Sequence, residues 1–316
     1  MNDRLETRVL GTSPDEITKA GQRLAKGQLV AFPTETVYGL GADATNDTAV
    51  ARIFAAKGRP SFNPLIAHVP DMKTAERLCD FTDAARRLAD AFWPGALTLV
   101  LPLKPDSGIS KLVTAGGPSL AIRIPAGDVA TALLNAAGRP IAAPSANPSG
   151  RVSPTTAAHV LAGLNGRIDA VLDAGPCPVG VESTIIGFED GPTLLRAGGI
   201  PAEAIEACLG TSLKTPAIDA PLTAPGQLAS HYAPNAPLRL NAQSANDAEF
   251  MIGFGDVDGD VSLSANGDLV DAAANLFRLL HEADATGKPI AVAPIPETGL
   301  GRAINDRLRR AAAPRH

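Results

Sequence analysis

The sequence predicts an α/β or α+β protein built on a mixed sheet, followed by a second, smaller α/β domain. Helical and strand-like apolar patterns alternate through the first two-thirds of the chain, and its 316 residues exceed the usual size of one domain. Composition also changes after Gly210, where Thr, Pro, Ala and Ser dominate without an apolar period. We therefore expect a first domain at 1–210, an extended linker at 211–237 and a small domain at 238–316.

The first domain is expected to begin with a helix over 15–26, which ends at Gly27, and a buried strand over 29–32. Apolar residues at helical spacing predict another helix over 48–57, with Lys57 in its last turn. The other expected elements are strands at 65–69, 97–101, 119–124, 141–143, 170–172 and 183–186, and helices at 72–79, 83–92, 129–137 and 155–164. In the small domain the same patterns predict strands at 250–254 and 289–293 and helices at 271–282 and 301–312.

Composition favours a soluble globular protein of the cytoplasm. Hydrophobic residues make up 45% and charged residues 19%, and no apolar run approaches the roughly 18 residues that span a bilayer. The N-terminal residues carry mixed charges with no apolar stretch behind them, so we expect no secretion signal. A net charge of −5 argues against a protein that grips long nucleic acid.

The three cysteines, Cys79, Cys177 and Cys208, lie far apart and lack the spacing of metal ligands. We expect them to be reduced and structural. Cys177 has no neighbouring His in its loop, which makes it a poor candidate nucleophile. The sequence therefore predicts no metal site made by protein side chains.

Residues 57–65, with the sequence KGRPSFNPL, are built to hold an anion. Two cations, a hydroxyl and an amide are grouped around one Gly and two Pro residues. The glycine allows close approach of the backbone, and the prolines fix φ, so the polar groups have little freedom left to lose. Because Lys57 and Arg59 lie at the expected end of a helix, where the macrodipole favours cations, a charged helix cap is the alternative.

Two further segments place polar groups beside buried strands. Residues 33–41, PTETVYGLG, follow the strand at 29–32, so their hydroxyls are expected in a loop at the sheet edge where α/β proteins bind ligands. A Thr-rich turn that caps the next helix is the alternative. Arg123 is the one charge in the apolar run 120–125, and its planar fork suits a carboxylate or a phosphate, with an internal salt bridge as the alternative.

Three weaker motifs complete the set. Residues 144–150, PSANPSG, follow a short buried strand and offer a small hydrogen-bonding cradle, although an ordinary Asn-Pro turn would look similar. Residues 182–186, ESTII, and 195–198, LRAG, each match a strand edge when taken alone. Their joint occurrence, in order along the chain, is more informative than any one of them.

In this order, PTETVYGLG, KGRPSFNPL, LAIRIP, PSANPSG, ESTII and LLRAG closely resemble the YrdC-domain family of L-threonylcarbamoyladenylate synthases, over residues 12–208. Residues 230–234, SHYAP, and 299–308, GLGRAINDRL, look like the linker and C-terminal domain of its longer, two-domain branch. The resemblance implies a twisted mixed-sheet YrdC-like domain, a linker and a second, smaller Rossmann-like α/β domain.

Enzymes of this family condense L-threonine, bicarbonate and ATP into threonylcarbamoyl-AMP and pyrophosphate. The product supplies the threonylcarbamoyl group for adenosine 37 of tRNAs that read ANN codons, and partner proteins modify the tRNA. The resemblance therefore implies these three ligands, Mg²⁺ held mainly by the ATP phosphates, and no strong direct binding of tRNA. A carbamate oxygen attacks the α-phosphorus, so positioning and charge neutralisation should dominate and no nucleophilic side chain is required.

By motif match, the resemblance also implies two groups of binding residues. The ATP contacts are Lys57, Arg59, Asn63, Ser119, Ser145, Ser153, Arg196 and Tyr232, with Lys57 and Arg59 as the catalytic residues. The L-threonine contacts are Thr36, His68, Arg123 and Ser183, with Arg123 on the carboxylate. Taken without the resemblance, a lone imidazole on a strand such as His68 is more often a satisfied core or edge residue.

Two positions depart from the family pattern. Ala143 stands where many members are expected to carry a hydroxyl, so any threonine contact from that hydroxyl is lost here or made by backbone or water. Residues 227–229, Gln-Leu-Ala, replace an expected Met-Lys-Tyr/His run, which puts in doubt how the linker closes over the nucleotide. We nevertheless expect the linker to act as a lid, with residues 230–232 reaching the ATP site.

Two other functions fit parts of the sequence. Carbamoyl transfer through a carbamoyl-adenylate, as in hydrogenase-maturation proteins with a similar domain, would be accompanied by acylphosphatase-like and cysteine-rich zinc modules that this sequence does not contain. A non-catalytic RNA-binding module would need a basic stripe and exposed aromatic residues, yet aromatics make up 4% of a negatively charged chain.

Overall fold

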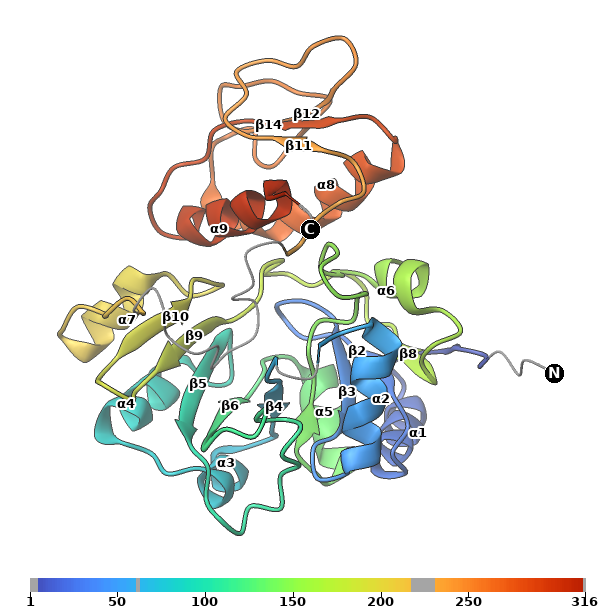
Figure 1. Cartoon of the computed structure of the whole chain (residues 1–316), viewed down its shortest axis with the longest axis vertical. Helices are drawn as coiled ribbons and strands as arrows, with labels where there is room; N and C mark the ends of the chain where they lie inside the picture. Colours follow the sequence, from blue (N-terminus) through green and yellow to red (C-terminus); the bar gives the residue numbers. More distant parts are fainter. Residues whose placement is uncertain (1–4, 61–62, 217–230, 315–316) are drawn as a thin grey trace.

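The computed structural model describes residues 5–60, 63–216 and 231–314, which form a larger and a smaller α/β unit (Figure 1). The strands of the larger unit are β1 (Arg8–Leu10), β2 (Val30–Phe32), β3 (Gly39–Asp43), β4 (Ile66–His68), β5 (Leu97–Pro102), β6 (Ser119–Arg123), β7 (Ile141–Ala142), β8 (Ala170–Leu172), β9 (Thr184–Gly187) and β10 (Thr193–Arg196). Its helices are α1 (Pro14–Ala25), α2 (Asp47–Lys57), α3 (Met72–Leu78), α4 (Asp83–Phe92), α5 (Asp128–Ala137), α6 (Ala157–Leu164) and α7 (Ala202–Leu209).

One mixed sheet organises the larger unit, as the sequence predicts. Its strand order is β1-β8-β2-β3-β7-β4-β6-β5-β9-β10. Parallel pairs such as β4 with β6 and β5 with β9 alternate with antiparallel pairs such as β5 with β6. Because β4, β6 and β7 are neighbours, residues from distant motifs end beside one another in the middle of the sheet.

Local capping signals set the ends of the helix that leads to the expected anion segment. The side chain of Asn46 accepts a hydrogen bond from the backbone N–H of Ala49 at the start of α2. Gly58 follows the last helical residue, Lys57, with φ of 60°, a left-handed conformation that glycine adopts without strain. The predicted helix end is therefore confirmed.

The predicted loop over 33–41 is wrong at its C-terminal end, because Gly39 and Gly41 lie in strand β3. A side chain at Gly41 would come within 3.0 Å of both Ile141 and Phe32, so glycine serves close packing here and not a turn. The predictions also missed β1 and α7, and gave β10 only as a strand edge at 195–198; these elements are short or weakly patterned.

The smaller unit contains a parallel sheet of strands β11 (Leu238–Arg239), β12 (Phe250–Gly253), β13 (Val261–Ser262) and β14 (Ile290–Val292), in the order β11-β14-β12-β13. Its helices α8 (Leu269–Ala285) and α9 (Gly301–Ala312) lie between this sheet and the larger unit (Figure 1). The expected α/β fold of this unit is confirmed, although β11 and β13 were missed. The domain boundaries at 210 and 237 stay a prediction, because most of the expected linker lies outside the described residues.

Candidate functional site

A cavity with about 520 Å³ of empty space lies where the loops and strand ends of the larger unit meet residues 231 and 232. Eight of the residues predicted from the sequence line it: Thr36, Arg59, His68, Arg123, Ser145, Ser183, Arg196 and Tyr232. The structure therefore brings together side chains from both predicted groups, on eight separate segments.

Arg123, the last residue of β6, is held by three neighbours in the cavity wall. Its Nε donates to the carbonyl of Gly95 (3.0 Å) and its Nη1 donates to Oγ1 of Thr36 (2.9 Å). Its Nη2 lies 2.7 Å from Oε1 of Glu35, an ion pair whose alignment is not that of a hydrogen bond. The internal salt bridge that the sequence left open as an alternative is thus present beside a cavity that Arg123 also lines.

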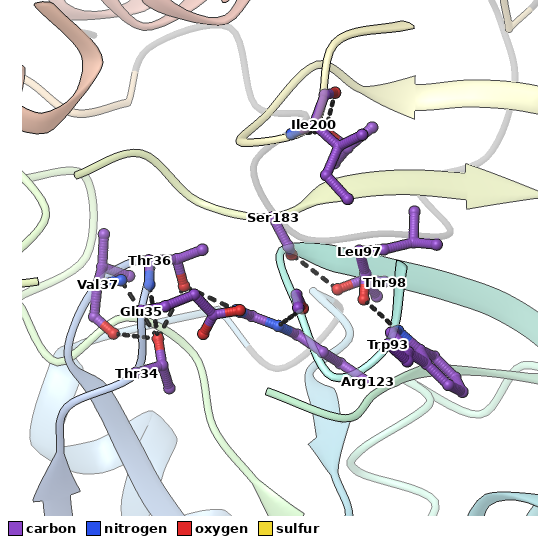
Figure 2. Close-up of polar contacts among 12 residues, drawn as sticks. Thr34, Glu35, Thr36, Val37, Trp93, Leu97, Thr98, Arg123, Ser183 and Ile200 are labelled. Carbon is purple, nitrogen blue, oxygen red and sulfur yellow. Dashed lines mark hydrogen bonds and ion pairs between the residues drawn. The ribbon is translucent and has the colours of Figure 1, made fainter. Parts of the chain in front are cut away.

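The loop between β2 and β3 fixes the Thr36 hydroxyl in front of this arginine (Figure 2). The Thr34 hydroxyl donates to the carbonyl of Val37 (2.8 Å), so the contact of 2.8 Å between the two threonine hydroxyls has Thr36 as donor. Since Thr36 also accepts from Arg123, one lone pair on its oxygen is left for a ligand.

Ser183 is held on the other side of the cavity, just before β9. Its Oγ lies 2.7 Å from the hydroxyl of Thr98 (Figure 2). Arg196 clamps the same residue, because its Nε and Nη2 donate to the Ser183 carbonyl at 3.1 and 2.9 Å and Nη2 also reaches Oγ at 3.2 Å. The hydroxyl therefore has a fixed position in the cavity wall.

Three buried cations, Lys57, Arg59 and Arg196, form what we term the cationic cluster. Burial lowers the pKa of each of them, to about 10 for Arg59, and Arg59 also lowers the pKa of Lys57 by repulsion. Lys57 does not line the cavity, since its Nζ donates to the backbone carbonyls of Ser145 (2.6 Å) and Asn147. Because burial and mutual repulsion disfavour the charged forms of these side chains, the cluster is suited to an anionic ligand.

Three other predicted ATP contacts lie outside the cavity lining. Asn63 is buried, and Ser119 begins β6, whose opposite end reaches the cavity. Ser153 instead donates its hydroxyl to Oε1 of Glu182 (2.5 Å), which does line the cavity. Residues 61 and 62 of the expected anion segment lie outside the described residues.

His68, on β4, combines the two roles that its sequence context left open. It lines the cavity, but it is also a satisfied core residue, with Nδ1 3.2 Å from the carbonyl of Ile66 and its ring edge-on to Phe32. Burial, reinforced by Arg123, lowers its pKa to about 3. The imidazole is therefore neutral at pH 7 and offers a hydrogen bond without charge.

Two residues of the expected linker, His231 and Tyr232, complete the cavity. Tyr232 is buried with a φ of 62°, and its ring packs against Phe277 of α8 and under the guanidinium of Arg307 of α9. Burial and the nearby cations, of which Arg59 contributes most, lower the pKa of His231 to about 3. Residues 231 and 232 thus line the cavity, their contact with ATP stays a prediction, and 227–230 lie outside the described residues.

The sequence reasoning missed a buried contact between the two units. Nε of Arg307 lies 3.0 Å from Oε2 of Glu182, and its Nη1 donates to the carbonyl of Ala197 (2.5 Å). Burial alone would raise the pKa of Glu182, but the nearby arginines and the Ser153 hydroxyl outweigh it and lower the pKa. Glu182 and Arg307 each stand in a quoted motif, so a search for charges of opposite sign among the motifs could have suggested the pair.

Ala143, the position that departs from the family pattern, lines the cavity with a methyl group. It lies close to Gly39, where an added Cβ would be 3.2 Å from the Ala143 methyl. The side chain of this residue gives a ligand no hydrogen bond, so polar contacts must come from its neighbours.

In the described ranges, no group of three His, Cys, Asp or Glu side chains is arranged to hold a metal ion, and no helix is long and apolar enough to cross a membrane. All three cysteines are free, and burial raises the pKa of the Cys79 and Cys177 thiols to about 12. These thiols are poor nucleophiles at neutral pH.

Comparison with known proteins covers both units. The Sua5, YciO and YrdC family, described as telomere recombination, matches residues 22–198, and the domain described as threonylcarbamoyl-AMP synthase, C-terminal domain, matches residues 200–313.

The threonylcarbamoyl-AMP synthase of Bacillus subtilis (strain 168) is 42% identical, over 97% of this chain and 95% of that protein. The enzyme of that name from Pyrococcus abyssi (strain GE5 / Orsay) is 41% identical over 92% of each. The crystal structure of P. abyssi Sua5 complexed with L-threonine matches with a TM-score of 0.89 at 38% identity, covering 97% of this chain and 98% of that one.

Proposed function

The chain belongs to the Sua5/YrdC family and is a threonylcarbamoyl-AMP synthase, and we propose that it makes its product from L-threonine, bicarbonate and ATP with release of pyrophosphate. The observation that supports these substrates is one cavity lined by Arg123 with its hydroxyl partner Thr36 and by Arg59 and Arg196. An amino-acid carboxylate and a triphosphate each need a cation, and both must bind within reach of one another.

The reaction consists of two steps. The threonine amine and bicarbonate form a carbamate with loss of water; a carbamate oxygen then bonds to the α-phosphorus of ATP as the bond to pyrophosphate breaks. Negative charge grows on the leaving pyrophosphate, and fixed cations such as Arg59 and Arg196 stabilise it. Mg²⁺ would be held mainly by the phosphates and water, in keeping with a cavity whose carboxylate, Glu182, is already paired with Arg307.

We assign the L-threonine contacts to Thr36, His68, Arg123 and Ser183, and the phosphate and nucleotide contacts to Arg59, Ser145, Arg196 and Tyr232. Lys57 is proposed to act from behind the cavity, by fixing the backbone of Ser145 and adding positive charge. Ser153 is proposed to act through Glu182. Asn63 and Ser119 receive no role from the geometry described above.

Pyrophosphate release measured with ATP and Mg²⁺ tests the proposal. L-Threonine and bicarbonate are omitted in turn, the latter by work in CO₂-free buffer, and the adenylate product is identified by mass spectrometry. Release that requires both compounds is expected. Release that continues without either of them would contradict the proposed substrates.

We further propose that the enzyme works in the cytoplasm and passes its product to proteins that modify adenosine 37 of ANN-reading tRNAs. The net charge of −5 supports a chain that does not itself bind tRNA strongly. A binding assay with such a tRNA at physiological salt tests this part, and nanomolar affinity would contradict it.

A further inference from the structure

Glu35 presents a buried carboxylate to Arg123, and none of the roles assigned above uses it. The side chains of Arg123 and Glu35 are only 4% and 12% exposed, and Nη2 lies 2.7 Å from Oε1. Both carboxylate oxygens of Glu35 are buried, and neither accepts a hydrogen bond within the described part of the chain. A buried carboxylate normally accepts several hydrogen bonds, so these two oxygens have unused capacity.

Arg123 does not depend on Glu35 for its orientation. Hydrogen bonds to the carbonyl of Gly95 and to the Thr36 hydroxyl already fix the guanidinium plane. Figure 2 shows the Glu35 carboxylate beside Thr36, facing the guanidinium. The contact between Glu35 and Arg123 is therefore one of charge. Glu35 is not itself among the residues that line the cavity, but Arg123 and Thr36 beside it are, so a ligand bound to Arg123 can exchange this contact for contacts of its own.

The charges of the pair determine which ligand is suitable. A simple carboxylate bound to Arg123 would place two carboxylates on one buried guanidinium, and their repulsion would oppose binding. An α-amino acid carries an ammonium group two bonds from its carboxylate, so each of its charges can face the opposite charge of the pair. The pair and a zwitterion are therefore complementary.

On the basis of the proposed function, we propose that Glu35 binds the α-ammonium group of L-threonine while Arg123 binds its carboxylate. The two carboxylate oxygens of Glu35, which accept no hydrogen bond in the described part of the chain, accept N–H groups of the ammonium. The internal ion pair is then replaced by two ion pairs to the ligand. Glu35 is thus a specificity-determining residue that selects amino acids over hydroxy acids lacking the amine.

Calorimetric titration with L-threonine and with 3-hydroxybutyrate, which lacks only the amine, tests the proposal on the full-length protein. In Glu35→Gln, we expect the affinity for L-threonine to fall by about 10- to 100-fold, the loss typical of a hydrogen bond to a charged group. The affinity for 3-hydroxybutyrate should stay the same or rise, because a repelling carboxylate has been removed. Glu35→Asp, which keeps the charge, should keep the preference for L-threonine.

Glu249→Gln is a matched control, because Glu249 lies 2.6 Å from Arg239 in the smaller unit with a side chain 7% exposed. It should bind both compounds as the wild type does. Equal losses of both compounds in Glu35→Gln would mean that Glu35 only supports Arg123, and unchanged threonine affinity would mean that it does not touch the amine; either result overturns the proposal. Pyrophosphate release by the wild type tests the proposed function separately: wild-type turnover together with an unchanged preference in Glu35→Gln refutes this inference alone.

Discussion

The Glu35–Arg123 pair and the cationic cluster lie in one site but differ in their net charge. Arg123 is matched by a buried carboxylate at 2.7 Å, so this part of the site is close to neutral. Lys57 and Arg59 instead repel one another, and burial lowers the pKa of both. A neutral pair suits a zwitterion, whereas a cluster of buried cations that repel one another suits phosphates, and the two parts should therefore respond differently to the loss of a cation.

The largest effect is expected from Arg123→Gln. This change leaves the Glu35 carboxylate buried without a cation, and breaking such a pair lowers the free energy of unfolding by about 3–5 kcal/mol. Urea unfolding measures the loss, and threonine-dependent pyrophosphate release should disappear as well. The double variant Glu35→Gln/Arg123→Gln should recover stability but no activity. A single variant as stable as the wild type would show that the pair is not electrostatically matched.

Arg59→Gln should have the opposite pattern, with a large loss of rate and little loss of stability. Loss of one fixed donor to developing charge raises the barrier by about 2.7–4 kcal/mol, or 10²- to 10³-fold in pyrophosphate release. The free energy of unfolding should stay level or increase, because a buried and repelled charge has been removed. Arg309→Gln, on an exposed pair with Glu297, is a control that should change neither quantity. Destabilisation of Arg59→Gln equal to that of Arg123→Gln would erase the distinction between the two parts.

The sequence could predict features that depend on nearby residues. The end of α2 at Lys57 and Gly58 follows from a helical period and a glycine cap, and both are local signals. The motif order, through the family resemblance, also placed Thr36, Arg123 and Ser183 around one cavity. By contrast, Lys57 was expected to face the phosphates, but it does not line the cavity, and its ammonium donates to the backbone carbonyls of Ser145 and Asn147, almost ninety positions away.

Charge pairing was the part of the site that the sequence left open. Nothing near Arg123 in the chain indicates that Glu35 would be its partner, because β6 and the loop after β2 meet only through the strand order of the sheet. Arg307 and Glu182 are 125 positions apart and meet only when the smaller unit docks on the larger one. Such pairs are set by the tertiary fold. The motifs therefore indicate which charged residues belong to the site, but not which of them pair with each other.

The pH dependence of stability gives a smaller effect that compares the two parts through their histidines. The folded state keeps His68 neutral, with a pKa of about 3, while the unfolded chain binds a proton near pH 6.5. The unfolded state therefore holds more protons between these values, and stability falls as the pH falls from 6.5 towards 3. In His68→Asn, the slope of unfolding free energy against pH over this range should decrease by about 1.4 kcal/mol per pH unit.

His231 extends this comparison to the cationic cluster. Its pKa is also about 3, lowered by burial and then by Arg59 and Lys57. Pyrophosphate should neutralise these cations and raise the pKa of His231 more than that of His68, as NMR titration of the imidazole resonances would show. Equal shifts at both histidines would indicate that pyrophosphate does not discriminate between the two parts of the site.

The smallest effect is expected at Ala143, which lines the cavity without offering a hydrogen bond. Ala143→Ser adds a hydroxyl to a residue that lines the cavity, and its oxygen is expected to turn to the ligand. One neutral hydrogen bond is worth about 0.5–1.5 kcal/mol, so the affinity for L-threonine should rise by about 2- to 10-fold in calorimetric titration. Ala143→Val, which adds bulk without a hydroxyl, should not produce this gain. If the serine strengthens ATP binding instead, Ala143 belongs with the cationic cluster, and the division between a zwitterion-binding and a phosphate-binding part must be drawn on the other side of this residue.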